Sequence, residues 1–132
     1  MSYGLKFNNI HCETLGLDLL DSSRPILAET KDTFEELPFL SGSILIADNS
    51  LKDIEVTATF ALEAFRNETF NDACRRIAEW LKVDTWQRLI FDDDPNYYYK
   101  AKPVGQIDRE QIVRNLGQFT VRFRCHPEMQ EV

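Results

Sequence analysis

Two segments alternate apolar and polar residues so regularly that they restrict the fold more than any other feature of the chain. The first, Ile54–Glu63, has its apolar face at every second position: Ile54, Val56, Ala58, Phe60 and Leu62. The second, Gln118–His126, does the same: Phe119, Val121, Phe123 and Cys125. A period of two is typical of a β-strand with one face on a core and one in water, as is common in antiparallel sheets.

One helix is predicted between these strands, over about residues 69–82. Its apolar residues follow the 3.6-residue period of an amphipathic helix: Phe70, Cys74, Ile77, Ala78 and Leu81. Asn67 or Thr69 can cap its N-terminus, which explains the pattern Asn67-Glu68-Thr69 better than glycosylation does, because nothing in the chain indicates secretion. Trp80 lies off the stripe, where it would cover a neighbouring sheet edge.

Shorter strands are predicted at six further places: Leu5–Phe7, Ile26–Glu29, Ser43–Ile46, Arg88–Phe91, Tyr97–Lys102 and Gly105–Asp108. Strands outnumber helices, and most gaps between them have hairpin length, which favours antiparallel pairing. The sequence therefore predicts a β-rich α+β fold with a single helix packed on or beside the sheet. The 132 residues contain no repeat or linker, so we expect one domain over residues 1–132.

One segment, residues 31–48, fits a compact domain poorly. It begins with acidic residues and then becomes apolar on both sides of a Ser41-Gly42-Ser43 turn signal. A hairpin that projected alone would expose an apolar patch that needs a partner. The residues alone leave a second arrangement open, in which the hairpin folds back on the sheet.

Charge is distributed unevenly along the chain. The net charge of −7 argues against a general phosphate-binding surface. Acidic side chains dominate residues 21–55, whereas basic side chains dominate residues 100–124. This asymmetry is compatible with two surfaces of opposite sign that associate head to tail, or simply with solvated strand faces.

The cysteines and the N-terminus bear on the cellular compartment. The chain has three cysteines, Cys12, Cys74 and Cys125. Their number is odd and no two of them form a CxxC pair, so we expect free, packed thiols. No apolar run approaches the roughly 20 residues of a membrane helix, and the N-terminus lacks the features of a signal peptide. We therefore expect a protein made in a cytoplasm, without a membrane segment.

The acidic triplet Asp92–Asp94 is the best candidate for metal chemistry. Asp92, Asp94 and Asn96 match the first three ligand positions of an EF-hand loop, but Tyr97 replaces its glycine and Pro103 its final glutamate. Asp94-Pro95-Asn96 also suits a β-turn between two strands, which is the interpretation we prefer. A metal-dependent enzyme that uses Asp92, Asp93 and Asp94 is kept as an alternative.

Two further kinds of site are possible from the residue types. The pairs His11-Cys12 and Cys125-His126 could supply zinc ligands or a nucleophile, but strand neighbours point to opposite faces and no catalytic motif is present. Tyr97–Tyr99 could form the aromatic platform of a monomeric β-sandwich binding module. We predict no enzyme, no cofactor and no metal.

Several segments together resemble the N-terminal domain of the distal tail protein (Dit) of siphophages, a phage tail protein family. The matching segments occur in family order over about residues 3–127: Gly4–Ile10, Leu37–Ile46, Ile54–Phe60, Ile77–Leu81, Leu89–Ala101 and Gly117–Pro127. The resemblance implies a β-sandwich with one α-helix and a projecting β-hairpin at about residues 31–48. It also implies a virion structural protein in place of an enzyme.

The resemblance further implies an assembly. Such domains form a hexameric ring at the tail tip or baseplate of a phage or prophage, between the major tail (tube) protein and the tail hub, tail-associated lysin or fibre protein. DNA only passes through the lumen, no membrane is involved, and the ring is built in the host cytoplasm. The hairpin residues expected between protomers are Leu37, Phe39, Leu40, Leu45 and Ile46. Many members carry a C-terminal carbohydrate-binding-like domain, which we expect to be missing from a chain that stops at Val132.

Overall fold

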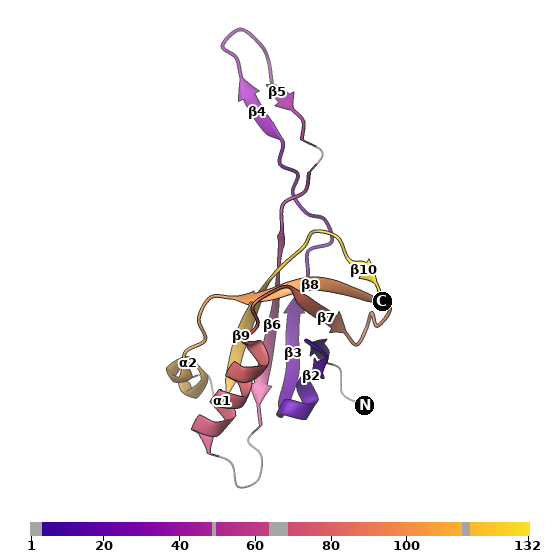
Figure 1. Ribbon diagram of the computed structural model, residues 1–132. Helices are drawn as coiled ribbons and strands as arrows, with labels where there is room; N and C mark the ends of the chain where they lie inside the picture. Colours follow the sequence, from indigo (N-terminus) through magenta and orange to yellow (C-terminus); the bar gives the residue numbers. More distant parts are fainter. Residues whose placement is uncertain (1–3, 49, 64–68, 115–116) are drawn as a thin grey trace.

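The structure is a computed structural model that describes residues 4–48, 50–63, 69–114 and 117–132 (Figure 1). Its helices are α1 (Phe70–Leu81), α2 (Arg109–Arg114) and the 3₁₀ turn η1 (Cys12–Leu15). Its strands are β1 (Leu5–Phe7), β2 (Ile10–His11), β3 (Leu17–Ser23), β4 (Thr33–Glu36), β5 (Ser43–Ile46), β6 (Ile54–Leu62), β7 (Gln87–Phe91), β8 (Tyr97–Val104), β9 (Gln118–Cys125) and β10 (Gln130–Glu131). The β-rich class is as predicted.

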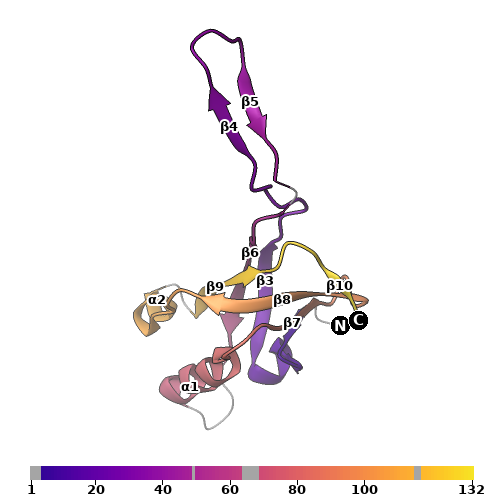
Figure 2. The ribbon, with the colours of Figure 1, turned by 45° about the horizontal axis from the view of Figure 1, so that its top comes forward.

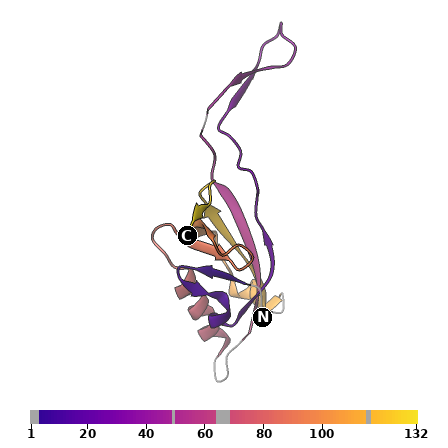
Figure 3. The same cartoon turned by 90° about the vertical axis from the view of Figure 1, so that its right-hand side faces the viewer.

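The main sheet is antiparallel and folds back on itself. Its strand order is β2-β1-β7-β8-β9-β6-β3, and β10 pairs with β8. Although β7 and β8 lie between β1 and β9 in this order, the ring centroids of Phe7 and Phe123 are only 5.1 Å apart. The two halves of the sheet therefore face each other across a common core, as a β-sandwich requires (Figure 3). This confirms the predicted fold class.

The two regular strands form the centre of the sandwich. β6 and β9 pair along their length, with Val56 opposite Phe123 and Phe60 opposite Phe119. The predicted apolar faces of both strands are buried, except that Leu62 at the end of β6 is only partly buried. On the outer face the hydroxyls of Thr59 and Thr120 lie 3.0 Å apart, so the polar positions also pair across the strands.

The hairpin between β1 and β2 has a backbone that its sequence explains. Phe7 pairs with Ile10, which leaves a two-residue loop of Asn8 and Asn9. Their φ angles are 53° and 65°, the left-handed values that a type I′ turn needs and that asparagine tolerates. The turn places the 3₁₀ segment η1 directly after β2.

Helix α1 is capped as predicted but buries a different face. The Thr69 hydroxyl accepts a hydrogen bond from the Asp72 N–H at 3.2 Å, whereas the alternative cap Asn67 lies outside the described residues. The buried positions are Ala73, Ile77 and Trp80. Trp80, expected to cover an edge, lies in the core instead. The predicted stripe is thus only partly covered.

The indole of Trp80 connects α1 to both layers of the sandwich. Its Nε1–H donates to the Phe7 carbonyl at 3.0 Å, and its ring meets the Phe7 and Phe60 rings edge-on. The helix therefore closes the core where the two layers separate. Within the described residues, neither helix is long and apolar enough to cross a membrane.

Two strand predictions need correction, and several elements were not predicted. Ile26–Glu29 is irregular, because Pro25 has no N–H to donate and pairing begins only at the Thr30–Leu51 bridge. The two-residue strands β2 and β10 were not predicted. The longest strand that was not predicted is β3, which pairs with β6 and has a bulge between Leu19 and Asp21 that breaks its alternation.

The second wrong prediction is Gly105–Asp108. This segment is not a strand but a connection that leads into α2. Gly105 has a φ of 82°, so the chain turns there at the end of β8. Helix α2 was not predicted, since Ile112 is the one buried side chain in its six residues.

Candidate assembly interface

The hairpin of β4 and β5 projects away from the sandwich as an arm. We use "arm" for residues 30–51, from the Thr30–Leu51 bridge to the tip. Its two strands form a separate sheet that pairs with nothing else in the described chain. Figures 1 and 2 show the arm extending from the end of the sandwich opposite α1. The projecting arrangement is thus the one found, and the folded-back alternative is wrong.

The arm is a regular ladder closed by a wide turn. Phe34 lies opposite Leu45, and Glu35 opposite Ile44. At the tip the Leu40 N–H donates to the Leu37 carbonyl at 3.2 Å, with Pro38 in the second turn position that its fixed φ suits. The chain returns through Gly42, whose φ is 80°. The loop is longer than the Ser-Gly turn expected from the sequence.

All five predicted interface residues are exposed, and Phe39 at the tip is 95% exposed. Leu45 and Ile46 are neighbours on one strand, so they lie on opposite faces of the arm. Both faces are therefore apolar. Further exposed apolar residues that the sequence analysis did not single out lie in the same region: Ile26, Leu27, Phe34 and Ile44. The density of apolar residues around the turn was a signal for Phe34 and Ile44, whereas Ile26 and Leu27 precede the arm and were assigned to a predicted strand.

The root of the arm is held by backbone bonds and carboxylates. The Lys52 N–H donates to the Glu29 carbonyl at 2.8 Å, which continues the ladder beyond the bridge. The Asp32 carboxylate accepts the Asp48 N–H at 2.6 Å and the Thr30 hydroxyl at 2.7 Å. These bonds lower the pKa of Asp32, because they favour its ionised form. These bonds hold the two strands of the arm together at its root.

The segment that leads to the arm is anchored to the β7–β8 turn. Arg24 binds Asp93 with both guanidinium Nη atoms, at 2.9 and 2.6 Å. The same guanidinium lies 4.2 Å from the centre of the Phe91 ring. A bidentate pair on an aromatic face positions a side chain more strictly than a simple ion pair does. Asp93 is thus a structural anchor.

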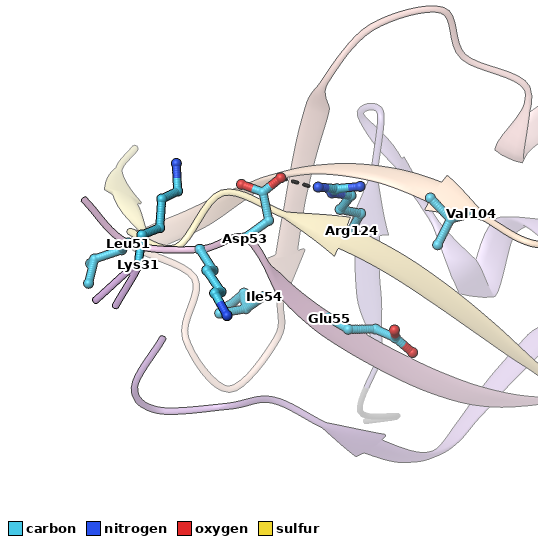
Figure 4. Close-up of a pocket in the computed structure, with 8 residues that line it drawn as sticks. Lys31, Leu51, Asp53, Ile54, Glu55, Val104 and Arg124 are labelled. Carbon is cyan, nitrogen blue, oxygen red and sulfur yellow. Dashed lines mark hydrogen bonds and ion pairs between the residues drawn. The ribbon is translucent and has the colours of Figure 1, made fainter. Parts of the chain in front are cut away.

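A hollow of about 510 Å³ lies where the arm meets the sandwich (Figure 4). Lys31 and Leu51 line it from the arm, and Val104 from the end of β8. Figure 4 shows Asp53 directed at Arg124, an ion pair with a 2.8 Å contact. Its charged lining includes both signs, so it favours no single charged ligand.

The other aspartates of the acidic triplet do not converge on one point. Asp92 accepts the Gly4 N–H at 2.8 Å and binds His11 Nε2 at 2.9 Å. Asp94 contributes its backbone to the turn, where its N–H donates to the Phe91 carbonyl at 3.0 Å. Within the described residues, no group of three His, Cys, Asp or Glu side chains is placed to hold a metal ion. The metal-enzyme alternative therefore lacks a ligand set in this part of the chain.

The structural role of Asp92 can be tested. We expect Asp92→Ala to lower the free energy of unfolding by about 1–2 kcal/mol, because it removes charged acceptors from Gly4 and His11. Urea denaturation measures the change. Glu79→Ala, at an exposed position of α1, is the control and should change stability by less than about 0.5 kcal/mol. Equal effects of the two substitutions would contradict this role.

The three tyrosines do not form a binding platform. Tyr98 and Tyr99 are buried on opposite faces of β8, and only Tyr97 is exposed. The Tyr98 hydroxyl donates to Gln130 of β10 at 2.8 Å. Tyr99 meets the Phe91 ring edge-on at 6.4 Å. Two of the three side chains therefore pack, and the aromatic platform of the binding-module alternative is not present.

The two Cys–His pairs lie apart and are occupied. His11 Nδ1 accepts the Glu13 N–H at 3.1 Å, so Nε2 carries the proton that is shared with Asp92. His126 packs edge-on against Trp86 at 4.8 Å. The two thiols, of Cys12 next to His11 and of Cys125 next to His126, are fully buried. These positions match packed thiols and neither a zinc site nor a nucleophile.

Thiol reactivity should separate the cysteines. Cys12 and Cys125 are fully buried, which raises the pKa of Cys125 to about 12 and also raises that of Cys12, so both thiols should resist modification until the protein unfolds. Burial also raises the pKa of Cys74, but this thiol is only partly buried and should react slowly in the native state. A thiol titration with Ellman's reagent, before and after denaturant, measures this. Two or more reactive thiols in the native protein would contradict the burial.

The same shift predicts a pH dependence. The folded state keeps Cys125 protonated up to about pH 12, whereas the unfolded thiol ionises near its ordinary pKa of 9.0. The unfolded state therefore binds fewer protons between these values, and stability should fall as pH rises through this window. Urea midpoints at rising alkaline pH test this, and Cys125→Ala should weaken the dependence. An equal dependence in both proteins would contradict it.

Comparisons with known proteins give this architecture a family. The sequence profile of the phage tail protein RIFT-related domain matches residues 10–125, which is most of the chain and includes the arm. The chain belongs to this family. It is a phage tail protein domain of the Dit-like type, as the sequence resemblance predicted.

Two similar proteins extend the comparison. The SPbeta prophage-derived uncharacterized protein YomH of Bacillus subtilis (strain 168) is 26% identical over 125 residues, which cover 92% of this chain and 48% of YomH. The crystal structure of SPP1 Dit (gp 19.1) superposes with a TM-score of 0.76 at 16% identity, over 100% of this chain and 53% of that one. SPP1 Dit is described as a paradigm of the hub adsorption apparatus in phages that infect Gram-positive bacteria. The Dit-like chain spans about half the length of each.

Proposed function

We propose that this Dit-like chain is the ring-forming structural domain of a phage or prophage tail tip. In this proposal six copies form a closed ring that connects the tail tube protein to the hub, tail-associated lysin or fibre protein. The observation that carries it is the arm, an ordered hairpin whose apolar residues have no cover in the described chain. A monomer with such a surface would be prone to association, so a partner surface is expected.

The arm supplies the joint between neighbouring copies. Leu37, Phe39 and Leu40 form the apolar tip, and Leu45 and Ile46 extend the surface along both faces. Because the arm points away from its own sandwich, it contacts a different surface on the next copy. Such a contact is heterologous, and it forms a ring where the rotation between copies closes. The resemblance to distal tail proteins supports six copies.

Charge supports the same head-to-tail arrangement. The arm carries an excess of acidic side chains, which include Asp32, Glu35, Glu36 and Asp48. Basic side chains lie on β8, α2 and β9, among them Lys102, Arg109 and Arg122. Surfaces of opposite sign on one molecule favour ordered association with a second copy. A net-acidic ring is also suited to a lumen through which DNA passes without binding.

A structural role without catalysis is part of this proposal. Its place is the tail tip of the virion, after assembly in the host cytoplasm, with residues 1–132 as a single ring-forming domain. The partners above and below the ring are the tube and hub proteins, as the resemblance implies. Support comes from the family match and from the structural roles of Asp92 and Asp93 in place of catalytic ones.

Electron microscopy of the purified chain in negative stain tests the proposal. We expect ring-shaped particles with six-fold symmetry in class averages. A preparation that carries Phe39→Ser and Leu40→Ser should contain no rings, because the tip has lost its apolar contacts. Particles of a single copy in the wild-type preparation, or equal ring formation by both proteins, would contradict the arm as the joint.

A further inference from the structure

A groove of about 300 Å³ lies between α1, α2 and the end of β8. Its lining is mostly apolar and includes Ile77, Ala78, Leu81, Val104, Ile107 and Val121. A second hollow of about 310 Å³, which shares Arg109 with the groove, reaches Phe70 and Val113, which are 37% and 61% exposed. Exposed apolar side chains thus lie on both sides of Arg109 at this end of the molecule.

This groove explains why the apolar stripe of α1 is only partly covered. The helix buries Ala73, Ile77 and Trp80 in the core, although its sequence places a broader apolar stripe on one side. Cys74, Ala78 and Leu81 complete that stripe, and they line the groove. A helix that carries more apolar surface than its own domain covers is typical of a docking site.

The rim of the groove is basic. Lys82 and Arg109 line it, and the Arg122 guanidinium lies against Gly105, another lining residue. Arg109 is held in place by a 2.8 Å hydrogen bond from its Nη1 to the Asn71 side chain. A ligand that combines an apolar end with negative charge would fit this arrangement.

The tip of the arm has this composition. Leu37, Phe39 and Leu40 form its apolar end, and Glu35 and Glu36 directly precede them on β4. The arm from Thr30 to Leu37 is long enough to extend roughly 25 Å from the sandwich. Figures 1 and 2 show the arm extending away from the sandwich and from α1 and α2, so the tip of one copy cannot reach the groove between its own helices.

We propose that the groove between α1, α2 and β8 receives the arm tip of a second copy of this chain. Phe39 and Leu40 enter between the helices, and Glu35 and Glu36 lie against the basic rim of Lys82, Arg109 and Arg122. This inference rests on the proposed assembly function and names the surface that the arm occupies. It also gives the second surface of the heterologous contact, which is repeated around the ring.

The native thiol Cys74 provides a direct test, because it lines the groove while Cys12 and Cys125 are fully buried. Ser41→Cys places a second thiol beside the intact tip. Mild oxidation with diamide, which takes up the two electrons and two protons, should form a disulfide between this introduced thiol and Cys74 of a neighbouring copy. Non-reducing electrophoresis should show a ladder of multimers, and peptide mass mapping should identify the link. Adding Cys74→Ser is the matched control and should remove the ladder.

A groove variant gives a second test that does not depend on cross-linking. Ala78→Glu places a carboxylate in the groove at an exposed helix position, where glutamate is a good helix former. We expect it to weaken self-association at least 100-fold, because the contact would desolvate the new carboxylate and because it would repel Glu35 and Glu36 and compete with them for the basic rim. Ala78→Ser, which adds only a small neutral group, should associate nearly as the parent does.

The outcomes separate this inference from the assembly proposal. Oligomers that form without the link from the introduced thiol to Cys74, and that tolerate Ala78→Glu, would overturn the groove but leave the arm as the joint. A disulfide within a single copy would also overturn it. A wild-type chain that remains monomeric at tens of micromolar would overturn both. Linked multimers together with loss of association in Ala78→Glu are the expected result.

Discussion

Replacing Phe39 and Leu40 together by serine is expected to abolish self-association at concentrations where the wild-type chain assembles. Both side chains are exposed in the single copy, at 95% and 57%, so their burial can occur only against a partner. Burying a phenylalanine or leucine contributes about 1.5–3 kcal/mol. Losing both should weaken each contact by roughly two to four powers of ten.

The same variant should leave the fold intact. The arm tip contributes nothing to the core. The free energy of unfolding, measured by urea denaturation, should therefore change by less than about 0.5 kcal/mol. Leu20→Ser, at a 50% exposed position of β3 away from the arm, is the control and should associate normally. Analytical ultracentrifugation across a concentration series measures both effects. Equal association by the double variant and the control would remove the arm from the interface.

Trp80→Ala should destabilise the fold more than any surface change. The indole is 2% exposed, contacts the Phe7 and Phe60 rings, and donates a hydrogen bond to the Phe7 carbonyl. Removing a buried tryptophan costs about 3–5 kcal/mol, a large part of the roughly 5–15 kcal/mol that stabilises a typical domain. Because Trp80 joins α1 to both layers, the groove should be disordered as well.

Urea denaturation followed by circular dichroism measures this loss. Trp86→Ala is the matched control, because Trp86 is 39% exposed and packs on His126 at the surface. Its substitution should cost less than about 1 kcal/mol. A Trp80 variant as stable as the Trp86 variant would show that α1 does not close the core as described.

The parts of the fold that the sequence predicted are those whose signal is local. The alternation in β6 and β9 follows from the geometry of a half-buried strand, and Thr69 could be identified as a cap from its hydroxyl and position. The turn at Asp94 and Pro95 also followed from local chemistry. Each needs only a few neighbouring residues to be specified.

The parts that were missed depend on distant contacts. β3 pairs with β6 through a bulge near Leu20, which interrupts the alternation that would have identified it. The burial of Trp80 depends on Phe7, which lies 73 positions away in the chain. The side chains of Asp92 and Asp93 anchor segments near the N-terminus and the arm. No local pattern could have specified these partners.

The candidate interface could be predicted from the sequence only in part. The five apolar residues of the arm could be identified from their density around a turn, and all are exposed in the structure. The groove could not be identified from the sequence. The apolar stripe of α1 looks like one that faces the core, and only the structure shows that Trp80 lies in the core and leaves part of the stripe uncovered. The proposed contact would pair the arm with the groove through apolar surface and opposite charge.

The mass of the wild-type chain in solution shows whether the chain assembles into six copies. Light scattering coupled to size exclusion, at tens of micromolar, should give six copies of the 15.4-kDa chain, about 92 kDa. Phe39→Ser with Leu40→Ser should give the mass of one copy under the same conditions. A wild-type chain that elutes as a single 15.4-kDa copy would contradict assembly through the arm.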